Sequence, residues 1–181
     1  MEASQDKEIS RFLSLVLRHK PDTIGLILDK SGWVDTIELL DKINSHGIHL
    51  PFEQLKSIVQ NNDKKRFVFS SDFSKIRANQ GHSIAVDLQL KELTPPNELY
   101  HGTSEKNIAS IKLQGLLRGS RHHVHLSTDS ETARRVGMRY GKPIVLIVDA
   151  KQMIDDGYKF FQSENGVWLT EHVMPKYIKF K

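Results

Sequence analysis

Apolar residues recur three or four positions apart near the start of the chain, at Ile9, Phe12, Leu13, Val16 and Leu17. This spacing predicts a helix with a single apolar stripe that faces a core. Pro21 ends the helix, because the residue before a proline is biased out of the helical region. Arg18 and His19 are therefore expected in its last turn.

Two further helices are predicted between residues 35 and 60 from their capping and apolar spacing. Asp35 and Glu38 form an Asp-x-x-Glu capping pattern, and Gly47 follows as a stop signal. The next helix starts at Pro51, a residue type favoured in the first helical turn. The apolar positions of these helices are Ile37, Leu39, Leu40 and Ile43 in one, and Leu55, Ile58 and Val59 in the other.

A hairpin and a domain boundary follow. Residues 66–69 and 75–78 are typical of two short strands around a Ser-Asp-Phe-Ser turn. Three helices and a two-stranded ribbon form the pattern of a winged helix, which alone says little about function. Thr94-Pro95-Pro96-Asn97 cannot continue a helix or a central strand, so we predict one domain over residues 1–94 and another over 97–181.

The second half predicts a small mixed domain of strands and short helices, so the chain as a whole is assigned to the α+β class. Strands are expected at residues 99–102, 124–127, 144–148, 167–169 and 177–180, and helices at 104–114 and about 130–136. The strand at 144–148 is entirely apolar, which predicts full burial. Trp33 and Trp168 are both expected in the core.

Composition narrows the class of protein. The absence of cysteine excludes disulfides and thiolate chemistry, and removes the usual zinc-finger ligands. The formal net charge is +4, but residues 1–95 carry 13 basic and 13 acidic side chains, whereas residues 96–181 carry 13 and 9. Bulk charge therefore assigns no nucleic-acid binding to the first half. A polar N-terminus and the lack of a long apolar run favour a cytoplasmic protein without a membrane partner, and a monomer is the default.

Two segments of the first half could bind an anion. Arg18 and His19 could present two cationic donors at a helix C-terminus, although cations are also favoured there simply as caps. Lys64-Lys65-Arg66-Phe67 and residues 76–83 (Ile-Arg-Ala-Asn-Gln-Gly-His-Ser) suit phosphate and base-edge contacts. A solvated hairpin explains the same basic run without a ligand.

Two segments of the second half also carry candidate chemistry. Tyr100-His101-Gly102-Thr103 could hold a ribose and a planar amide at a strand end, with the glycine allowing a ligand to approach the backbone. In residues 121–127 the strand alternation places Arg121, His123 and His125 on one face. Because no carboxylate or cysteine accompanies this cluster locally, an anion or ribose site is favoured and no metal site is predicted.

Together these motifs resemble the KptA-type RNA 2′-phosphotransferase family. The matching stretches are residues 12–14, 17–21, 32–33, 64–67, 76–83, 100–103, 123–127 and 165–170. Each is unspecific, but their joint occurrence in the family's order is specific and spans nearly the whole chain. The resemblance implies an N-terminal winged-helix RNA-binding lobe and a C-terminal, ADP-ribosyltransferase-like, NAD-binding lobe.

The resemblance also implies the reaction. The internal 2′-phosphate of an RNA displaces nicotinamide from NAD⁺, giving an RNA-2′-phospho-ADP-ribose intermediate. A neighbouring ribose hydroxyl then attacks phosphorus, which releases 2′-hydroxyl RNA and ADP-ribose 1″,2″-cyclic phosphate. NAD is thus a consumed co-substrate, and spliced tRNA is the RNA that the family implies. The chain has no Gly-x-Gly-x-x-Gly, which argues against a hydride-transfer dehydrogenase.

Residue by residue, the family's essential Arg-His-Arg-Arg tetrad matches Arg18, His19, Arg66 and Arg121, which we expect to meet around one phosphate. The family's NAD-site histidine matches His101, and Gly102 and Thr103 are expected beside the ribose and nicotinamide. Ser127 and Arg139 are predicted pyrophosphate or adenosine contacts. Many ADP-ribosyltransferases use a glutamate on the nicotinamide ribose; Glu164 is near in sequence, but a phosphate nucleophile makes that role unnecessary.

Two other functions remain open at this point. An ADP-ribosyltransferase that modifies nucleic-acid ends or protein would keep His101 and stop after the first step. A non-catalytic winged-helix module that binds nucleic acid would bind no NAD at all. The product formed, and the effect of NAD on the melting temperature, distinguish the three hypotheses.

Overall fold

The chain folds into two units, and each unit has its own hydrophobic core. The computed structural model describes residues 2–62 and 64–180, and the chain forms two compact units, Met1–Gln89 and Leu90–Lys181. The core of the first unit includes Leu13, Leu39 and Leu55, and the core of the second unit is formed only by residues of that unit. The predicted boundary at residues 94–97 lies shortly after the division between the units.

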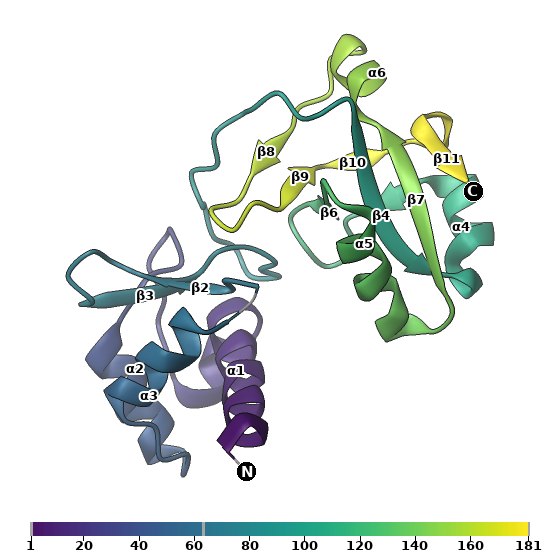
Figure 1. Ribbon diagram of the computed structural model, residues 1–181. Helices are drawn as coiled ribbons and strands as arrows, with labels where there is room; N and C mark the ends of the chain where they lie inside the picture. The colour runs from purple at the N-terminus through teal and green to yellow at the C-terminus, as the bar shows by residue number, and fades with distance from the viewer. Residues whose placement is uncertain (1, 63, 181) are drawn as a thin grey trace. The chain divides into compact units, whose positions relative to one another are not determined.

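The first unit begins with helix α1 (Glu2–Arg18), shown in purple in Figure 1. Its apolar stripe is buried as predicted, at Ile9, Leu13, Val16 and Leu17, with Phe12 partly buried beside it. The backbone N–H groups of His19 and Lys20 both donate to the Leu15 carbonyl, so the helix ends just before the short 3-10 helix η1 (Pro21–Ile24).

Helices α2 (Thr36–Ser45) and α3 (Phe52–Gln60) complete the helical part of this unit. The Asp35 side chain caps α2 by accepting hydrogen bonds from the backbone N–H groups of Ile37 and Glu38. Ile37 is 70% exposed, so its inclusion in the apolar face of α2 was wrong; it lies on the solvent side of the first turn. Pro51 occupies the cap position of α3 rather than its first turn.

A small antiparallel sheet covers the helices of the first unit. Strands β1 (Val34–Asp35), β3 (Lys75–Ala78) and β2 (Phe67–Phe69) lie side by side in that order, and Figure 1 shows the helices on one side of the β2–β3 hairpin. The predicted ribbon therefore gains a third strand, β1. Trp33, just before β1, is only half-buried, with the Arg77 guanidinium 4.6 Å above its ring, so the core prediction for it was wrong.

In the second unit, a central antiparallel sheet has the order β11-β7-β4, formed by Ile178–Phe180, Pro143–Asp149 and Glu98–Ser104. Only Leu146, Ile147 and Val148 of β7 are buried, so the prediction of a fully buried strand was wrong. Helix α5 (Ser130–Gly137) lies directly against β4, as Figure 1 also shows.

A second sheet with the order β6-β9-β8 carries the histidine-rich segment. Its strands are Val124–Leu126, Trp168–Thr170 and Phe161–Gln162, and Trp168 is buried as predicted. Reciprocal backbone hydrogen bonds between Tyr100 and Ser127 connect β4 to the residue after β6.

The remaining elements of the second unit frame these two sheets. They are η2 (Glu105–Asn107), α4 (Ile108–Gln114), β5 (Leu116–Leu117), η3 (Met138–Tyr140), α6 (Ala150–Asp155), β10 (His172–Val173) and η4 (Pro175–Tyr177). Strands β5 and β10 pair with each other. The patterns predicted neither this pair, nor β8, nor α6, because each is very short. The mixed helix and strand content agrees with the α+β class.

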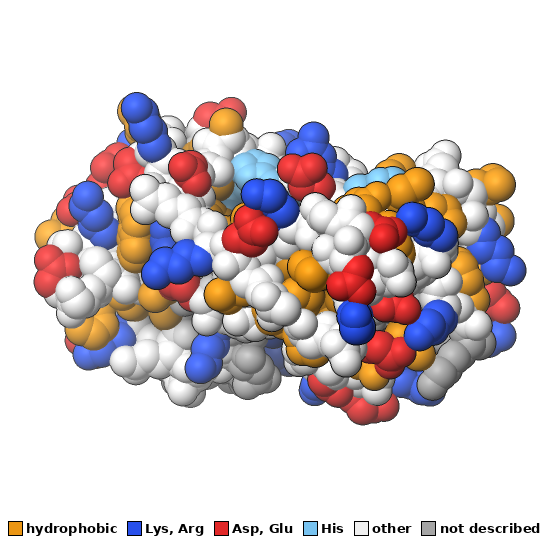
Figure 2. All heavy atoms as spheres, turned by 90° about the horizontal axis from the view of Figure 1, so that it is seen from above, with side chains coloured by type: hydrophobic (Ala, Val, Ile, Leu, Met, Phe, Trp, Pro, Cys, Tyr) orange, Lys and Arg blue, Asp and Glu red, His pale blue; other side chains and the backbone are white. Residues whose placement is uncertain are grey.

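Charges of both signs are interspersed on the face seen in Figure 2, in keeping with a net charge of only +4. In the described residues, no helix combines the length and the apolar character needed to cross a bilayer.

Candidate functional site

Arg18 is the most deeply placed cation among the predicted site residues. It is the last residue of α1, and only 9% of it is exposed. Its Nη2 donates to the Arg66 carbonyl oxygen at 3.1 Å, and its guanidinium carbon lies 5.7 Å from the centre of the Phe67 ring. Because Pro21 prevents α1 from continuing, the end of the helix places Arg18 against the start of β2.

Arg66 directly precedes β2 and is held on both sides. Its Nη1 donates to the Asn62 side-chain oxygen at 3.4 Å, and its carbonyl also accepts from the Asn79 backbone N–H at 2.9 Å. Burial lowers the pKa of Arg66, but a guanidinium remains charged in proteins. Residues 18 and 66 are therefore two permanent positive charges joined through one backbone carbonyl.

Asn79 supports the turn that carries Arg66. Its side chain is buried, and its Nδ2 donates to the Lys65 carbonyl at 2.6 Å. Lys65 has a φ of +40°, a backbone conformation that lysine rarely adopts. Sequence reasoning included Asn79 only as part of a polar motif; its contact with a residue 14 positions earlier could not be deduced from that motif.

His19 follows Arg18 and is fixed by Ser83. Its Nδ1 lies 2.9 Å from the Ser83 hydroxyl oxygen. The Ser83 backbone N–H donates to the Arg18 carbonyl, also at 2.9 Å. Ser83 thus contacts both residues of the Arg-His pair, and it satisfies a carbonyl that the end of the helix leaves without a helical partner.

Three of the four tetrad residues thus come together within the first unit. Arg18, His19 and Arg66 belong to two segments that are 48 residues apart, and we call them the phosphate cluster. Two guanidinium groups and an imidazole can supply several directed donors to a doubly charged anion.

In the second unit, His101 lies in the middle of β4 and is half-buried. Its Nδ1 is 3.0 Å from the backbone carbonyl oxygen of His125, which can only accept, so Nδ1 donates. Burial lowers the pKa of His101, and the nearby Arg121 charge lowers it further, although the bond to His125 acts in the opposite direction. His101 is therefore neutral near pH 7, with Nε2 as its acceptor atom.

Arg121, the fourth tetrad residue, is exposed and contacts the side chain of His125. Its Nη1 lies 3.1 Å from His125 Nδ1. The ring of His123 instead lies beside an aromatic ring, 5.6 Å from that of Phe161. Burial is the main cause that lowers the pKa of His123.

The other predicted NAD contacts have their own structural partners. A Cβ on Gly102 would lie 1.6 Å from the Ala133 carbonyl oxygen of α5, so helix packing already requires the glycine. Thr103 is buried and accepts from Asn107 Nδ2 at 3.1 Å. Ser127 accepts from the Asp129 backbone N–H at 3.3 Å, and Arg139 is exposed in η3.

Comparison with known proteins adds an independent finding. The family model described as "RNA 2'-phosphotransferase, Tpt1 / KptA family" matches residues 4–172. The chain belongs to this family. A "Probable RNA 2'-phosphotransferase" of Fusobacterium nucleatum is 54% identical over 97% of this chain and 98% of its own length. Proteins with the same description from Flavobacterium johnsoniae and Trichormus variabilis are 55% and 52% identical, over 97% and 98% of this chain and 96% and 98% of theirs.

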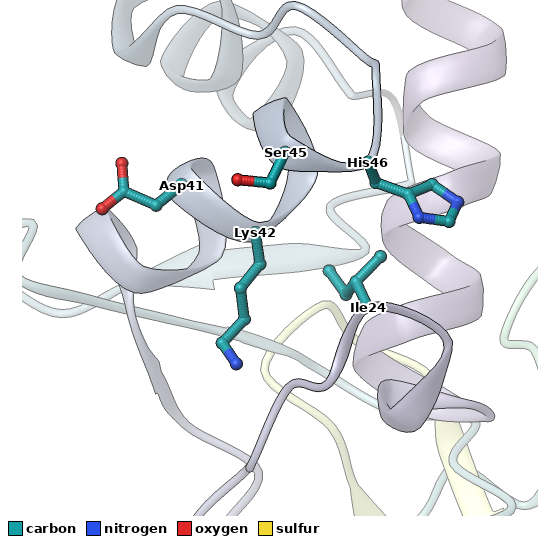
Figure 3. A pocket seen from close by; sticks show the side chains of 5 residues that line it. All are labelled: Ile24, Asp41, Lys42, Ser45 and His46. Atoms are coloured by element: carbon teal, nitrogen blue, oxygen red, sulfur yellow. The ribbon is translucent and has the colours of Figure 1, made fainter.

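The candidate site residues are those of the phosphate cluster in the first unit and His101 and Arg121 in the second, and they lie outside the pocket found in the first unit. A pocket in the first unit is lined by Ile24 of η1 and by Asp41, Lys42, Ser45 and His46 of α2 and its end (Figure 3). It contains no tetrad residue. Its one ammonium, on Lys42, already donates to the Gly25 carbonyl and pairs with Glu38 at 3.5 Å. Within the part of the chain that is described, no three His, Asp or Glu side chains come together as a metal site.

Proposed function

We propose that this protein removes an internal 2′-phosphate from RNA by transferring it to NAD⁺. One observation supports this most strongly. In this member of the RNA 2′-phosphotransferase family, the C-terminal end of α1 and the segment just before β2 bring Arg18, His19 and Arg66 together. Such a cluster suits a phosphate monoester dianion. The first unit is accordingly proposed as the winged-helix-like, RNA-binding lobe.

Arginine rather than lysine suits this role for a geometric reason. The planar guanidinium offers parallel N–H donors that match two phosphate oxygens at once, whereas an ammonium is a point charge. Arg18 is partly desolvated by Phe67 and by its own burial, so its interaction with an anion is screened less than at an open surface. We assign Arg121 of the second unit to the same phosphate, as the family resemblance implies.

In the proposed first step, an oxygen of the RNA 2′-phosphate attacks C1″ of the nicotinamide ribose. The C1″–N bond breaks, its electron pair returns to the nicotinamide ring, and neutral nicotinamide leaves. A phosphate dianion needs no base to become a nucleophile, so the task of the protein is orientation. Glu164 is not assigned a role in this step, although it lies in the turn before β9.

In the proposed second step, the 2″-hydroxyl of the same ribose attacks phosphorus, and the bond from phosphorus to the RNA 2′-oxygen breaks. The proton of the attacking hydroxyl ends on the RNA 2′-oxygen, and the sugar product is ADP-ribose 1″,2″-cyclic phosphate. Negative charge builds on the non-bridging oxygens, which fixed arginine donors stabilise. We assign His19, oriented by Ser83, to proton transfer in this step.

The second unit is proposed as the ADP-ribosyltransferase-like, NAD-binding lobe. His101 supports this because its neutral ring presents Nε2 as an acceptor, which suits a ribose hydroxyl of NAD⁺. Thr103 and the backbone at Gly102 follow His101 on β4, and the backbone of Ser127 is hydrogen-bonded to that of the neighbouring Tyr100. Ser127 and Arg139 are proposed for the pyrophosphate or adenosine.

The deciding experiment incubates the protein with an oligonucleotide that carries one internal 2′-phosphate, with and without NAD⁺. We expect loss of the phosphate, and formation of nicotinamide and the cyclic phosphate, only when NAD⁺ is present. A stable ADP-ribosylated RNA would instead indicate a transferase that stops after the first step. No reaction and no NAD⁺ binding would indicate a non-catalytic nucleic-acid-binding module.

Two arginines of α1 provide a matched pair of variants for this assay. Arg18→Ala removes a donor of the phosphate cluster and should lower the rate on the order of 10²–10³-fold. Arg11→Ala removes an exposed arginine of the same helix and should leave the rate within about 2-fold. Equal rates in the two variants would contradict the assignment of Arg18.

A Glu164→Ala variant tests whether the first step needs an acidic residue. Loss of the first step in this variant, with the fold retained, would contradict the view that no acid is required.

A further inference from the structure

His125 of β6 connects the two site residues of the second unit in two different ways. Its ring contacts the Arg121 guanidinium at 3.1 Å, and its backbone carbonyl binds the ring of His101 at 3.0 Å. One residue therefore connects the arginine assigned to the phosphate with the histidine assigned to NAD. The tetrad does not include His125.

The chemistry of the two partners determines where the protons lie. Arginine has only donors, so His125 Nδ1 must accept, and the proton of its neutral ring is on Nε2. The backbone carbonyl has only lone pairs, so His101 carries its proton on Nδ1. The two histidines therefore have opposite tautomers.

We propose that His125 is a positioning residue for Arg121, and that its unprotonated Nδ1 fixes the direction of the guanidinium. This inference rests on the proposed function, because it concerns how Arg121 reaches the transferred phosphate. Arg121 needs such a partner because it is exposed, and a long side chain without a fixed contact samples many rotamers. Errors of about 1 Å in the placement of such a group cost up to about 10²-fold in rate.

The two contacts of His125 can be separated by mutation. The bond to Arg121 uses the side chain, whereas the bond to His101 uses the backbone and survives any substitution that preserves β6. The backbone of β6 is in turn paired with β9, with His125 opposite Leu169. Changing the side chain should therefore affect catalysis by Arg121 and leave NAD⁺ binding through His101 unchanged.

Three variants test this separation. His125→Leu keeps the approximate volume but removes the acceptor, and should lower kcat about 10-fold to 100-fold, with the KM for NAD⁺ unchanged. His125→Asn places an amide oxygen near the position of Nδ1, and should recover kcat to within about 3-fold of the wild type. His172→Asn is the control: the ring of His172 also bonds a backbone carbonyl, that of Gln114, but in β10, and kcat should not change.

A double-mutant cycle then shows whether His125 acts through Arg121. If it does, His125→Leu should cost less than about 2-fold when Arg121 is already replaced by alanine, measured in single turnover. A full additional loss would show that His125 acts independently, and the proposal would be overturned. The same holds if His125→Leu has wild-type kcat, or if it raises the KM for NAD⁺ without changing kcat.

Nitrogen-15 NMR of histidine-labelled protein gives a readout independent of activity. We expect the His125 proton on Nε2 and the His101 proton on Nδ1, and the opposite tautomer at His125 would refute the proposal. An inactive wild-type protein with the expected tautomers would instead reject the proposed function while leaving the His125–Arg121 contact established. The two failures are therefore distinguishable.

Discussion

At the scale of single residues, the two units use the same device: a polar neighbour orients a histidine or an arginine of the candidate site. Ser83 contacts His19 at 2.9 Å, and His125 contacts Arg121 at 3.1 Å. Such neighbours matter because a side chain acts in a reaction only if its donors are already aligned with the charge that develops.

Ser83→Ala tests this device in the first unit. The substitution removes the hydroxyl beside His19 Nδ1 but keeps the backbone N–H that donates to the Arg18 carbonyl. We therefore expect kcat to fall about 10-fold with an unchanged melting temperature. Ser71→Ala, at an exposed turn of the same unit, is the control and should have wild-type kcat. A wild-type rate for Ser83→Ala would remove Ser83 from the site.

At the scale of elements, close packing and local charge determine how the second unit is assembled. Gly102 in β4 and Gly137 at the end of α5 let the strand and the helix approach closely, since a Cβ on Gly137 would lie 2.5 Å from the Thr103 carbonyl oxygen. Elsewhere, Asp156 after α6 accepts hydrogen bonds from Lys176 and Tyr177 of η4, so a carboxylate connects these two elements.

Gly102→Ala should destabilise the second unit. The added methyl group would lie 1.6 Å from the Ala133 carbonyl oxygen. The methyl group is fixed to the strand backbone and the carbonyl belongs to the helix backbone, so strand and helix must move apart. We expect a loss of about 3 kcal/mol in the free energy of unfolding, measured by denaturant titration. Unchanged stability would show that α5 does not lie this close to β4.

Asp156→Asn should make the stability less dependent on pH. Hydrogen bonds from Tyr177, Lys176 and Gln152 lower the pKa of Asp156 to about 2, below its ordinary value of 3.8. A carboxylate with a lowered folded-state pKa stabilises the fold above its ordinary pKa, and this contribution is lost as the pH falls toward 2. Melting curves should therefore show wild type more stable than Asp156→Asn at pH 7, with the difference shrinking between about pH 4 and 2. A constant difference across this range would contradict the assigned cause.

At the scale of the whole molecule, the chain has two cores, and the proposed chemistry assigns NAD⁺ to the second unit and the RNA phosphate to the phosphate cluster together with Arg121. The phosphate cluster belongs entirely to the first unit, and the His101–His125–Arg121 contacts belong entirely to the second. Binding of NAD⁺ should therefore respond to substitutions in the second unit and not to substitutions in the phosphate cluster.

Thermal unfolding with NAD⁺ tests this division. At about 100 times its Kd, NAD⁺ should stabilise the protein by about 2.7 kcal/mol, seen as a raised melting temperature. His101→Ala should abolish the shift, because it removes the acceptor Nε2, whereas Arg66→Ala should preserve it. If the shift were lost in both variants, the assignment of NAD⁺ to the second unit alone would be contradicted. If it were lost in neither, His101 would not belong to the NAD⁺ site.

The sequence alone determined the features that depend on near neighbours: the stripe and end of α1, the Asp35 cap, the β2–β3 hairpin, and the ordered motifs that indicated the family. Helical spacing, caps and turns involve residues a few positions apart, so their physical cause is visible in the sequence. Only the tertiary structure decided contacts between distant residues, such as Arg18 with Arg66, Asn79 with Lys65, and His101 with His125. The tertiary structure also decided that Ile37 is exposed, that Trp33 is only half-buried, and that the packing of α5 requires Gly102. Burial and close approach depend on which surfaces meet after folding.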